Sequence, residues 1–351
     1  MHKIAFTLIF STVFFLADAQ IGGRYTYEFL GNPQSARLSA LGGSLITIQD
    51  NDVSLAASNP ALLNDKMHNQ ITFNHNFAFA DVSNGYIGYG RKVNKWGGIN
   101  THVGISYVSF GEFTAADEIG NTNGTFSGGE TAITLGASKR LNERIVVGAN
   151  LKGIFGNLET YSSSGLGADL GVYYSKPESN FSAAFVVKNI GTELSTYGNE
   201  RANLPLDIQL GVSKKLNHLP FRFTIIAHQL QQWSVRYDDP NNVQSESIFE
   251  DEPSETSGFN EGVDNFFRHF IFNGEFLLGK TQGLKIRFGY NHFRRKELSL
   301  SNFRSLTGFS GGLGLRIKGF NIDYGVGYYH LAGAANHLSI RTDLGRFFKK
   351  F

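Results

Sequence analysis

The sequence has no cysteine, only 7 prolines and, beyond residue 16, no apolar run of membrane-spanning length. Without cysteine, a disulfide framework and thiol chemistry are excluded. A net charge of +2 argues against a nucleic-acid partner, because such proteins carry a concentrated basic patch. Glycine (41) and phenylalanine (31) are abundant, and the mean hydropathy is -0.18. This balance is too polar for a helical membrane protein and fits strands with one apolar face.

The single long apolar run lies at the start of the chain. Residues 1–3 (Met-His-Lys) are positively charged, residues 4–16 are almost all apolar, and residues 17–19 (Ala-Asp-Ala) match a cleavage site. The run is shorter than the roughly 20 residues of a spanning helix. We therefore expect residues 1–19 to be a signal peptide rather than a membrane anchor. No cysteine follows the cleavage site, which excludes a lipoprotein anchor.

From Asn69 onward, apolar residues alternate with polar or small ones. Clear examples are residues 71–80, 284–291 and 320–328. Successive side chains of a strand point to opposite faces, so each segment has one apolar face. A soluble sandwich would also alternate. However, Lys285, Arg287 and Asp323 lie in mid-strand opposite the apolar face, where they suit a polar lumen. We predict an all-β, transmembrane antiparallel barrel of about 14 strands over residues 69–351.

The predicted connections alternate in length. Strands are expected to begin near residues 69, 84, 97, 128, 143, 163, 180, 205, 219, 264, 282, 308, 319 and 336. Tight turns fall at residues 94–96, 141–143, 176–178, 216–218, 279–281 and 318–319, whereas residues 111–127, 189–204, 234–263 and 294–307 form longer loops. Short turns at one end and long loops at the other are typical of outer-membrane barrels, whose long loops lie outside the cell. An outer-membrane location follows, with loops at the cell surface.

Residues 20–68 lack this alternation. They contain short stretches rich in small residues, with helix N-caps expected at Ser35 and Asp52. Such short helices are unstable alone and must pack on something. A barrel of about 14 strands has room for more than its own side chains. We expect an N-terminal plug here, and a periplasmic leader is the alternative.

These residues also carry a family resemblance. Residues 27–44 (YEFLGNPQSARLSALGGS), 50–52 (DND) and 58–62 (SNPAL) resemble the PorV/PorQ family of Bacteroidetes, with the overall likeness greatest to the PorQ branch. The motif residues are Ser35, Ala36, Arg37, Gly42, Gly43, Asn59, Pro60 and Ala61. The resemblance continues through residues 189–191 to the last strand.

The resemblance implies a FadL-like barrel of fourteen strands with an N-terminal plug. It also implies membership of the type IX secretion system attachment complex. There a PorQ-like barrel carries a PorZ-like surface protein, and a PorV-like barrel carries the PorU-like sortase. The motifs alone do not separate the PorQ and PorV branches.

Enzyme chemistry has little support in the sequence. Residues 308–312 fit a Gly-x-Ser-x-Gly pattern, but that motif needs a strand-to-helix elbow. Ser310 instead begins a predicted strand, where the glycines permit close strand approach. The ten histidines do not cluster with carboxylates at ligand spacing. We expect a non-enzyme without catalytic residues, metal or cofactor, although a lipid or detergent molecule could fill the lumen.

Two predicted loops could bind a partner. Residues 234–263 are strongly acidic, with aromatic residues that suit an interface. The candidate residues there are Asp238, Asp239, Phe249, Glu250, Asp251, Glu252 and Phe259, and calcium could bridge the loop to its partner. A solvated, self-repelling loop is the alternative. Phe113 and Phe126 are the candidates in residues 111–127.

Two functions from different classes remain open. The first is a non-enzymatic anchor that holds a PorZ-like surface protein through its loops, in contact with outer-membrane lipid. The second is a FadL-like transporter of hydrophobic small molecules, and a PorV-like shuttle or sortase anchor is a variant of the first. A transporter needs an apolar pocket near the plug, whereas an anchor needs about 800 Å² of contact surface.

Overall fold

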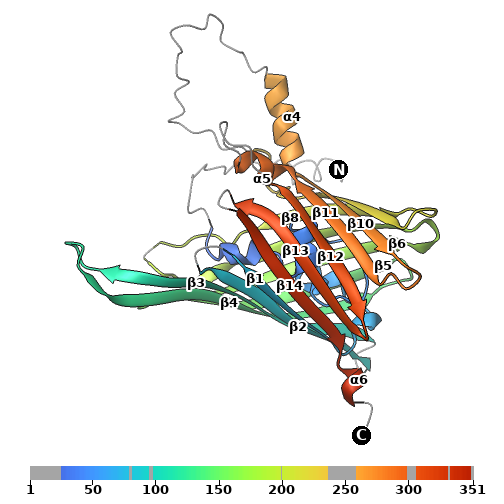
Figure 1. The fold of residues 1–351 in the computed structure, drawn as a ribbon, viewed down its shortest axis with the longest axis horizontal. Coiled ribbons are helices and arrows are strands. Elements are labelled where there is room, and N and C mark those ends of the chain that lie inside the picture. The colour runs from blue at the N-terminus through green and yellow to red at the C-terminus, as the bar shows by residue number, and fades with distance from the viewer. Residues whose placement is uncertain are drawn as a thin grey trace, which may run out of the picture.

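A computed structural model describes residues 25–78, 81–94, 98–198, 200–235, 258–298, 306–330 and 333–348. These residues form fourteen antiparallel strands in one closed barrel (Figure 1). Each strand pairs with its neighbours in sequence, and β1 closes the barrel against β14. The closing pair is regular, from Gln70 opposite Asp343 to Phe77 opposite Asn336. The predicted fold class, an antiparallel barrel of about 14 strands, is confirmed.

The strand bounds follow the predicted rhythm closely. The strands are β1 Gln70–Phe77, β2 Ser83–Val93, β3 Ile99–Ala116, β4 Thr122–Arg140, β5 Ile145–Leu158, β6 Tyr161–Lys176, β7 Phe181–Ser195, β8 Asp207–Lys215, β9 Phe221–Ala227, β10 Phe270–Leu278, β11 Leu284–Asn291, β12 Phe309–Ile317, β13 Phe320–His330 and β14 Gly333–Asp343. Two predicted starts are wrong by six residues: β4 begins at Thr122 rather than near residue 128, and the start near residue 264 falls in a helix. Asp264 lies in helix α4 (Gly258–Arg268), and the strand begins six residues later at Phe270.

The barrel is apolar outside and polar inside. On β4, for example, Ile133 and Leu135 point outward and are exposed, whereas Thr134 between them is buried. The mid-strand charges Arg287 and Asp323 are each 2% exposed and face the lumen, as predicted. A soluble protein would not expose a continuous apolar surface of this kind. The exposed face therefore fits hydrocarbon, where a sheet must also have no unpaired edge.

Short connections gather at the end where β1 begins and β14 ends, which we call the terminal end. There β4 and β5 are joined by residues 141–144 and β12 and β13 by residues 318–319. Longer segments lie at the opposite end, which we call the loop end, including α4 and α5 (His292–Glu297), and α6 (Gly345–Phe348) lies beyond the terminal end (Figure 1). No helix among the described residues is long and apolar enough to cross a membrane.

The prediction of a loop over residues 111–127 is wrong. β3 and β4 continue through this region as a two-stranded arm that projects from the barrel (Figure 1). β2 stops pairing with β3 at Ser109, and β5 stops pairing with β4 at Gly128. Beyond these positions β3 and β4 pair only with each other, up to Ala116 opposite Thr122. The residues here do not alternate between apolar and polar, since Phe110 and Phe113 lie three positions apart, and nearly all of the arm is exposed.

The chain before β1 lies inside the barrel. This N-terminal segment (residues 25–68) contains η1 (Glu28–Gly31), α2 (Ala36–Ala40), α3 (Leu55–Ser58), η2 (Pro60–Leu62) and η3 (Asp65–Met67). Its apolar side chains are almost fully buried, among them Leu38, Leu45 and Leu62. Helices of four or five residues are not stable alone, so the barrel wall must supply their packing.

A charge on the outer wall should destabilise the barrel. Ile133 points outward from the middle of β4, so Ile133→Arg places a cation in hydrocarbon. We expect a loss of about 2–4 kcal/mol in the free energy of unfolding, measured by urea titration in lipid vesicles. Ile119→Arg is the matched control, because Ile119 is 85% exposed at the tip of the arm. Equal losses in both variants would contradict the assignment of the outer wall.

Candidate functional site

Helix α2 is built to lie flat against the inner wall. The Ser35 hydroxyl caps its first turn by accepting from the Leu38 amide, as predicted. At its end, the amide of Gly43 donates to the Leu38 carbonyl, and Gly42 and Gly43 have φ of +73° and +98°. Only glycine adopts this backbone at low cost, which explains why these two motif positions are glycines.

Glycines in the wall allow α2 to approach the strands. A Cβ on Gly312 of β12 would lie 2.6 Å from the Ala40 side chain, and one on Gly289 of β11 would collide with the Gly42 amide. Ser310, between these contacts, accepts from the Gly42 amide at 2.9 Å and donates to the Ala40 carbonyl at 3.1 Å. Ser310 therefore positions the N-terminal segment, and this geometry contains no strand-to-helix elbow.

Polar contacts fix the segment to strands on several sides of the lumen. Wall side chains of β4, β5, β7, β8, β10, β11, β12 and β14 take part, namely Ser138, Asn150, Ser182, Gln209, Ser213, Asn273, Asn291, Ser310 and Ser339. Most of these bonds involve backbone groups of the segment, which its short helices leave unpaired.

The motif residues Asn59, Pro60 and Ala61 form the start of η2. The Asn59 side chain accepts from the Ala61 amide at 3.0 Å and donates to the Ile46 carbonyl at 3.0 Å. Pro60 occupies the first helical position, where its missing amide costs nothing. The Asp52 cap prediction is wrong, because the N-cap of α3 is Ser54 and Asp52 instead accepts from the amide and hydroxyl of Ser54.

The inner wall carries a chain of alternating charges. Arg222 of β9 pairs with Glu275 of β10, which also accepts from Arg287 of β11 at 3.0 Å. Arg287 in turn binds Asp323 of β13 at 2.6 Å, and Asp323 binds Arg341 of β14 at 2.8 Å. Almost all of these groups are withdrawn from water, where charges are tolerated only when paired. We call these five residues the wall chain.

The N-terminal segment carries its own charged triad. The fully buried Arg37 binds Asp50 at 2.6 Å and lies 3.6 Å from Asp52. Burial acts to raise the pKa of the Asp50 carboxyl, but Arg37 and more distant cations outweigh it and hold that pKa below its usual range. The Asp50 carboxyl is therefore charged at neutral pH.

Two ion pairs join the triad to the wall chain. Arg37 binds Glu275 at 3.2 Å, and Asp52 forms an ion pair with Arg341 at 3.2 Å. The two links close a ring of six charged side chains, which we call the ion-pair ring. The wall chain has three arginines against two carboxylates and carries +1, whereas the triad has one arginine against two and carries −1. The segment and wall therefore attract each other, yet each keeps internal partners.

A second buried pair lies on another part of the wall. Lys152 of β5 binds Asp169 of β6 and the side-chain oxygen of Asn189 of β7, each at 2.7 Å. Asp169 also accepts from the Asn189 amide, at the place where the β6–β7 register shifts. Asn189 has a φ of +59°, so the family-like residues 189–191 mark an irregularity in the wall.

The lumen also contains apolar surface. One patch is covered by the middle of the N-terminal segment and is formed by Val146, Tyr173, Ala184, Val186, Ile226 and Ile271. A second patch combines Val108, Ala132 and Ile154 of β3, β4 and β5 with Leu204, and we call it the inner apolar patch. Tyr27, Phe29 and Leu30 of the segment cover the inner apolar patch.

The predicted docking residues fall in two groups. Phe113 and Phe126 face each other across the arm, with stacked rings whose centroids are 5.2 Å apart. Asp238, Asp239, Phe249, Glu250, Asp251 and Glu252 lie outside the described residues, and Phe259 falls in α4, where side chains are described only from residue 262. The predicted signal peptide, residues 1–19, also lies outside them. Within the described part of the chain, no three His, Asp or Glu side chains gather as a metal site would require.

The sequence alone does not predict the pairing in the ion-pair ring. The motifs include Arg37, a helix cap is predicted at Asp52, and alternation places Arg287 and Asp323 in the lumen. None of these predictions gives the ion pairs between these residues, and Glu275 is not among them. Charged residues at inward positions of β10, β11, β13 and β14 were the available signal. The ion pairs between these strands and residues 37–52 depend on the path of the N-terminal segment inside the barrel. The alternation of apolar and polar residues does not predict that path.

The closed barrel with the N-terminal segment inside it resembles solved FadL-like outer-membrane barrels in fold. The toluene transporter TodX of Pseudomonas putida has a TM-score of 0.53 and 10% identity over 88% of this chain and 96% of its own. A TodX monoaromatic hydrocarbon channel mutant has a TM-score of 0.52 and 12% identity over 89% and 97%. A FadL homologue from Pseudomonas aeruginosa has a TM-score of 0.47, with 11% identity over 88% and 98%.

These identities establish the fold alone. No protein-family profile matches the sequence, and no curated protein shows significant similarity to it. The resemblance to the PorV/PorQ family therefore remains an expectation from the motifs.

Breaking the ion-pair ring should loosen the N-terminal segment. Arg37→Gln removes the cation shared by Asp50, Asp52 and Glu275, and the loss of one partner from a buried ion pair costs about 3 kcal/mol or more. We expect faster hydrogen exchange in residues 36–62, measured by mass spectrometry.

The matched control is Lys92→Gln. Lys92 also joins the wall to the segment, through Asp65, but this pair is largely exposed and should contribute less than about 1 kcal/mol. Unchanged exchange in Arg37→Gln would mean that the ring does not hold the segment.

Proposed function

We propose that this protein transports hydrophobic small molecules across the outer membrane. The observation that carries the proposal is the inner apolar patch, which lies on the luminal wall beneath Tyr27, Phe29 and Leu30. A hydrophobic ligand that replaced Phe29 and Leu30 would find the same apolar contacts.

The charge arrangement supports a segment that can shift. If the N-terminal segment moved away from the wall, Arg37 would keep Asp50 and Asp52, and Arg287 would keep Glu275 and Asp323. Only the two linking ion pairs of the ring would break. Displacement would therefore leave no charged group of the ring without a partner. The fold also resembles that of the TodX toluene transporter, and the likeness covers nearly the whole TodX chain. This likeness favours transport.

The inner apolar patch should determine ligand binding. Ile154 is fully buried in the patch, and Ile154→Asn introduces a polar side chain where the ligand would lie. We expect about tenfold weaker binding of toluene or a long-chain fatty acid to the detergent-solubilised barrel, measured by calorimetry. The matching uptake into vesicles should fall in parallel.

Leu141→Asn serves as the control, since Leu141 is exposed in the turn between β4 and β5. It should bind the ligand as the unmodified barrel does. If the unmodified barrel bound neither ligand and vesicles containing it took up no more than empty vesicles, the transport proposal would fail.

A second candidate function rests on the projecting arm. The strand edges from Phe110 to Ala116 and from Thr122 to Ser127 pair only with each other, so both outer edges are open. Open edges can accept another strand, and exposed aromatic residues anchor interfaces. Phe113 is exposed beside Phe126 on this arm. These features support an anchor for a PorZ-like surface protein in a type IX secretion attachment complex.

Replacing the aromatic pair should release such a partner. The double variant Phe113→Ser with Phe126→Ser leaves the barrel wall untouched, and the loss of an interface anchor costs about 2 kcal/mol or more. We expect a tagged barrel to lose its co-purifying surface protein from gently solubilised native membranes, as quantified by mass spectrometry. Tyr161→Ser, at another exposed position of the loop end, is the control. Equal recovery with all three proteins would refute docking through the arm.

A further inference from the structure

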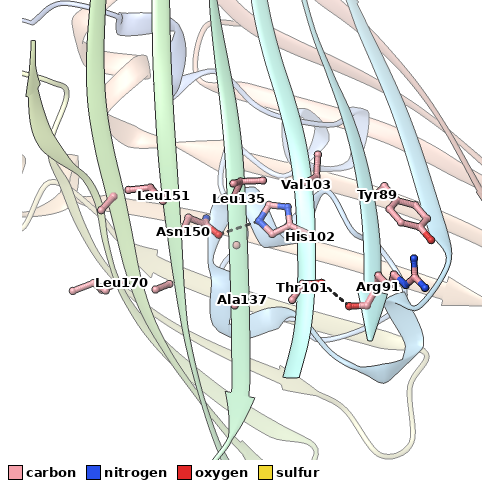
Figure 2. Close-up of a pocket in the computed structure, with 13 residues that line it drawn as sticks. Tyr89, Arg91, Thr101, His102, Val103, Leu135, Ala137, Asn150, Leu151 and Leu170 are labelled. Carbon is pink, nitrogen blue, oxygen red and sulfur yellow. Dashed lines mark hydrogen bonds between the residues drawn. The ribbon is translucent and has the colours of Figure 1, made fainter. Parts of the chain in front are cut away.

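The outer wall contains a groove that the transport proposal does not use. Its volume is about 600 Å³, and it crosses β2, β3, β4, β5 and β6 (Figure 2). Its floor is a row of small outward side chains, because Thr101, Ala137 and Ala149 lie side by side in the strand register. Arg91 continues the row at one end and Leu170 at the other. We call this feature the outer groove.

Bulky side chains form one edge of the outer groove. Val103, Leu135 and Leu151 occupy the next outward row, nearer the middle of the strands, and are 43%, 55% and 58% exposed. The groove is therefore a depression in an otherwise continuous apolar wall. Its size is within the range of small-molecule sites, and the exposed surface of its lining is mostly apolar, although Arg91, Thr101, His102 and Asn150 are among the lining residues. In a membrane, lipid chains are the molecules that meet this surface.

A cation marks one end of the outer groove. Arg91 is exposed, and within the described part of the chain its guanidinium has no ion-pair partner. The Arg91 carbonyl accepts from the Thr101 hydroxyl at 2.9 Å, which ties the backbone of β2 to the groove floor. Figure 2 draws the guanidinium beside the Tyr89 ring, at the end of the row. Lys139, one outward position beyond Ala137, adds a second cation at the rim.

The depth of Arg91 fits the level of lipid headgroups. Arg91 lies two residues before the end of β2, close to the terminal end of the barrel. An arginine facing lipid is costly at the bilayer centre, but the cost falls to about 0–1 kcal/mol near the interface. Its long side chain can keep the charge at the interface while its stem lies along apolar surface. An anionic phosphate at this level would be its natural partner.

The terminal end indicates which leaflet supplies the lipid. Short turns of outer-membrane barrels face the periplasm, and the outer groove lies at the end with the short turns. We propose that the outer groove binds an acyl chain of a phospholipid from the periplasmic leaflet, with the lipid phosphate held by Arg91. The site is on the outer wall, so it is independent of what the lumen carries.

The experiment uses the full barrel, delipidated in detergent and then mixed with phosphatidylglycerol or with phosphate-free diacylglycerol. Native mass spectrometry counts the lipids retained. We expect the unmodified barrel to retain phosphatidylglycerol in preference to diacylglycerol. Arg91→Gln should weaken phosphatidylglycerol binding about fivefold, the factor expected from one cation at an anionic lipid surface, and should remove the preference.

A second variant tests the groove itself. Ala137→Leu fills the floor and should reduce retention of both lipids. Its control is Ala183→Leu, an outward alanine of β7 near the same end, and Lys280→Gln in the β10–β11 turn is the control for loss of a cation. Folding of every variant is checked by heat-dependent gel mobility.

Three results would overturn the proposal. The unmodified barrel could retain no phosphatidylglycerol, or the control variants could lose as much lipid as Arg91→Gln and Ala137→Leu. Preferential retention of lipid A over phosphatidylglycerol in a competition would assign the groove to the other leaflet. None of these measurements depends on toluene or fatty-acid transport, so the two proposals can fail separately.

Discussion

Closure of the hydrogen-bond ladder between β1 and β14 is the constraint on which the rest of the structure depends. In hydrocarbon every unpaired backbone group costs several kcal/mol, so the sheet has to return to its first strand. Closure divides the alternating side chains into an outward set that meets lipid and an inward set that meets the lumen. The ion-pair ring and inner apolar patch exist on one side of this division, and the outer groove on the other.

The lumen of a barrel this wide cannot be filled by its own side chains. The N-terminal segment fills part of it, and glycines such as Gly289 and Gly312 let the backbone of α2 come within contact of the wall. The segment has little internal regular structure, and its exposed amides and carbonyls are satisfied by serine and asparagine side chains of the strands. The barrel thus completes the folding of a segment that could not fold alone.

Much of this architecture could be predicted from alternation and turn residues. The strand number, the lumen-facing charges and the short turns needed only the period of two and the positions of polar turn residues. The arm around Phe113 was missed because its polar and glycine-rich residues do not alternate, so that the sequence alone is typical of a loop. The ring was missed because its links, Arg37 to Glu275 and Asp52 to Arg341, join residues more than 200 positions apart. Alternation predicts whether a side chain faces the lumen or the lipid, but it does not predict the partner of that side chain across the lumen.

The contacts of the segment divide into two kinds with different responses to a ligand. The ion pairs between Arg37, Asp52 and the wall are directional and weaken when water enters, because the effective dielectric constant rises. The contacts of Phe29 and Leu30 with the inner apolar patch are not directional, so any apolar molecule of similar size can replace them. If the transport proposal holds, a hydrophobic ligand would compete directly with the apolar contacts, whereas the ring would resist displacement until water reached it. The triad and the wall chain each keep their own ion pairs when the segment moves. Only the two linking pairs, Arg37–Glu275 and Asp52–Arg341, therefore oppose its displacement. The polarity of the lumen would then determine how easily the N-terminal segment leaves the wall. The inner apolar patch would determine which molecules can displace the segment.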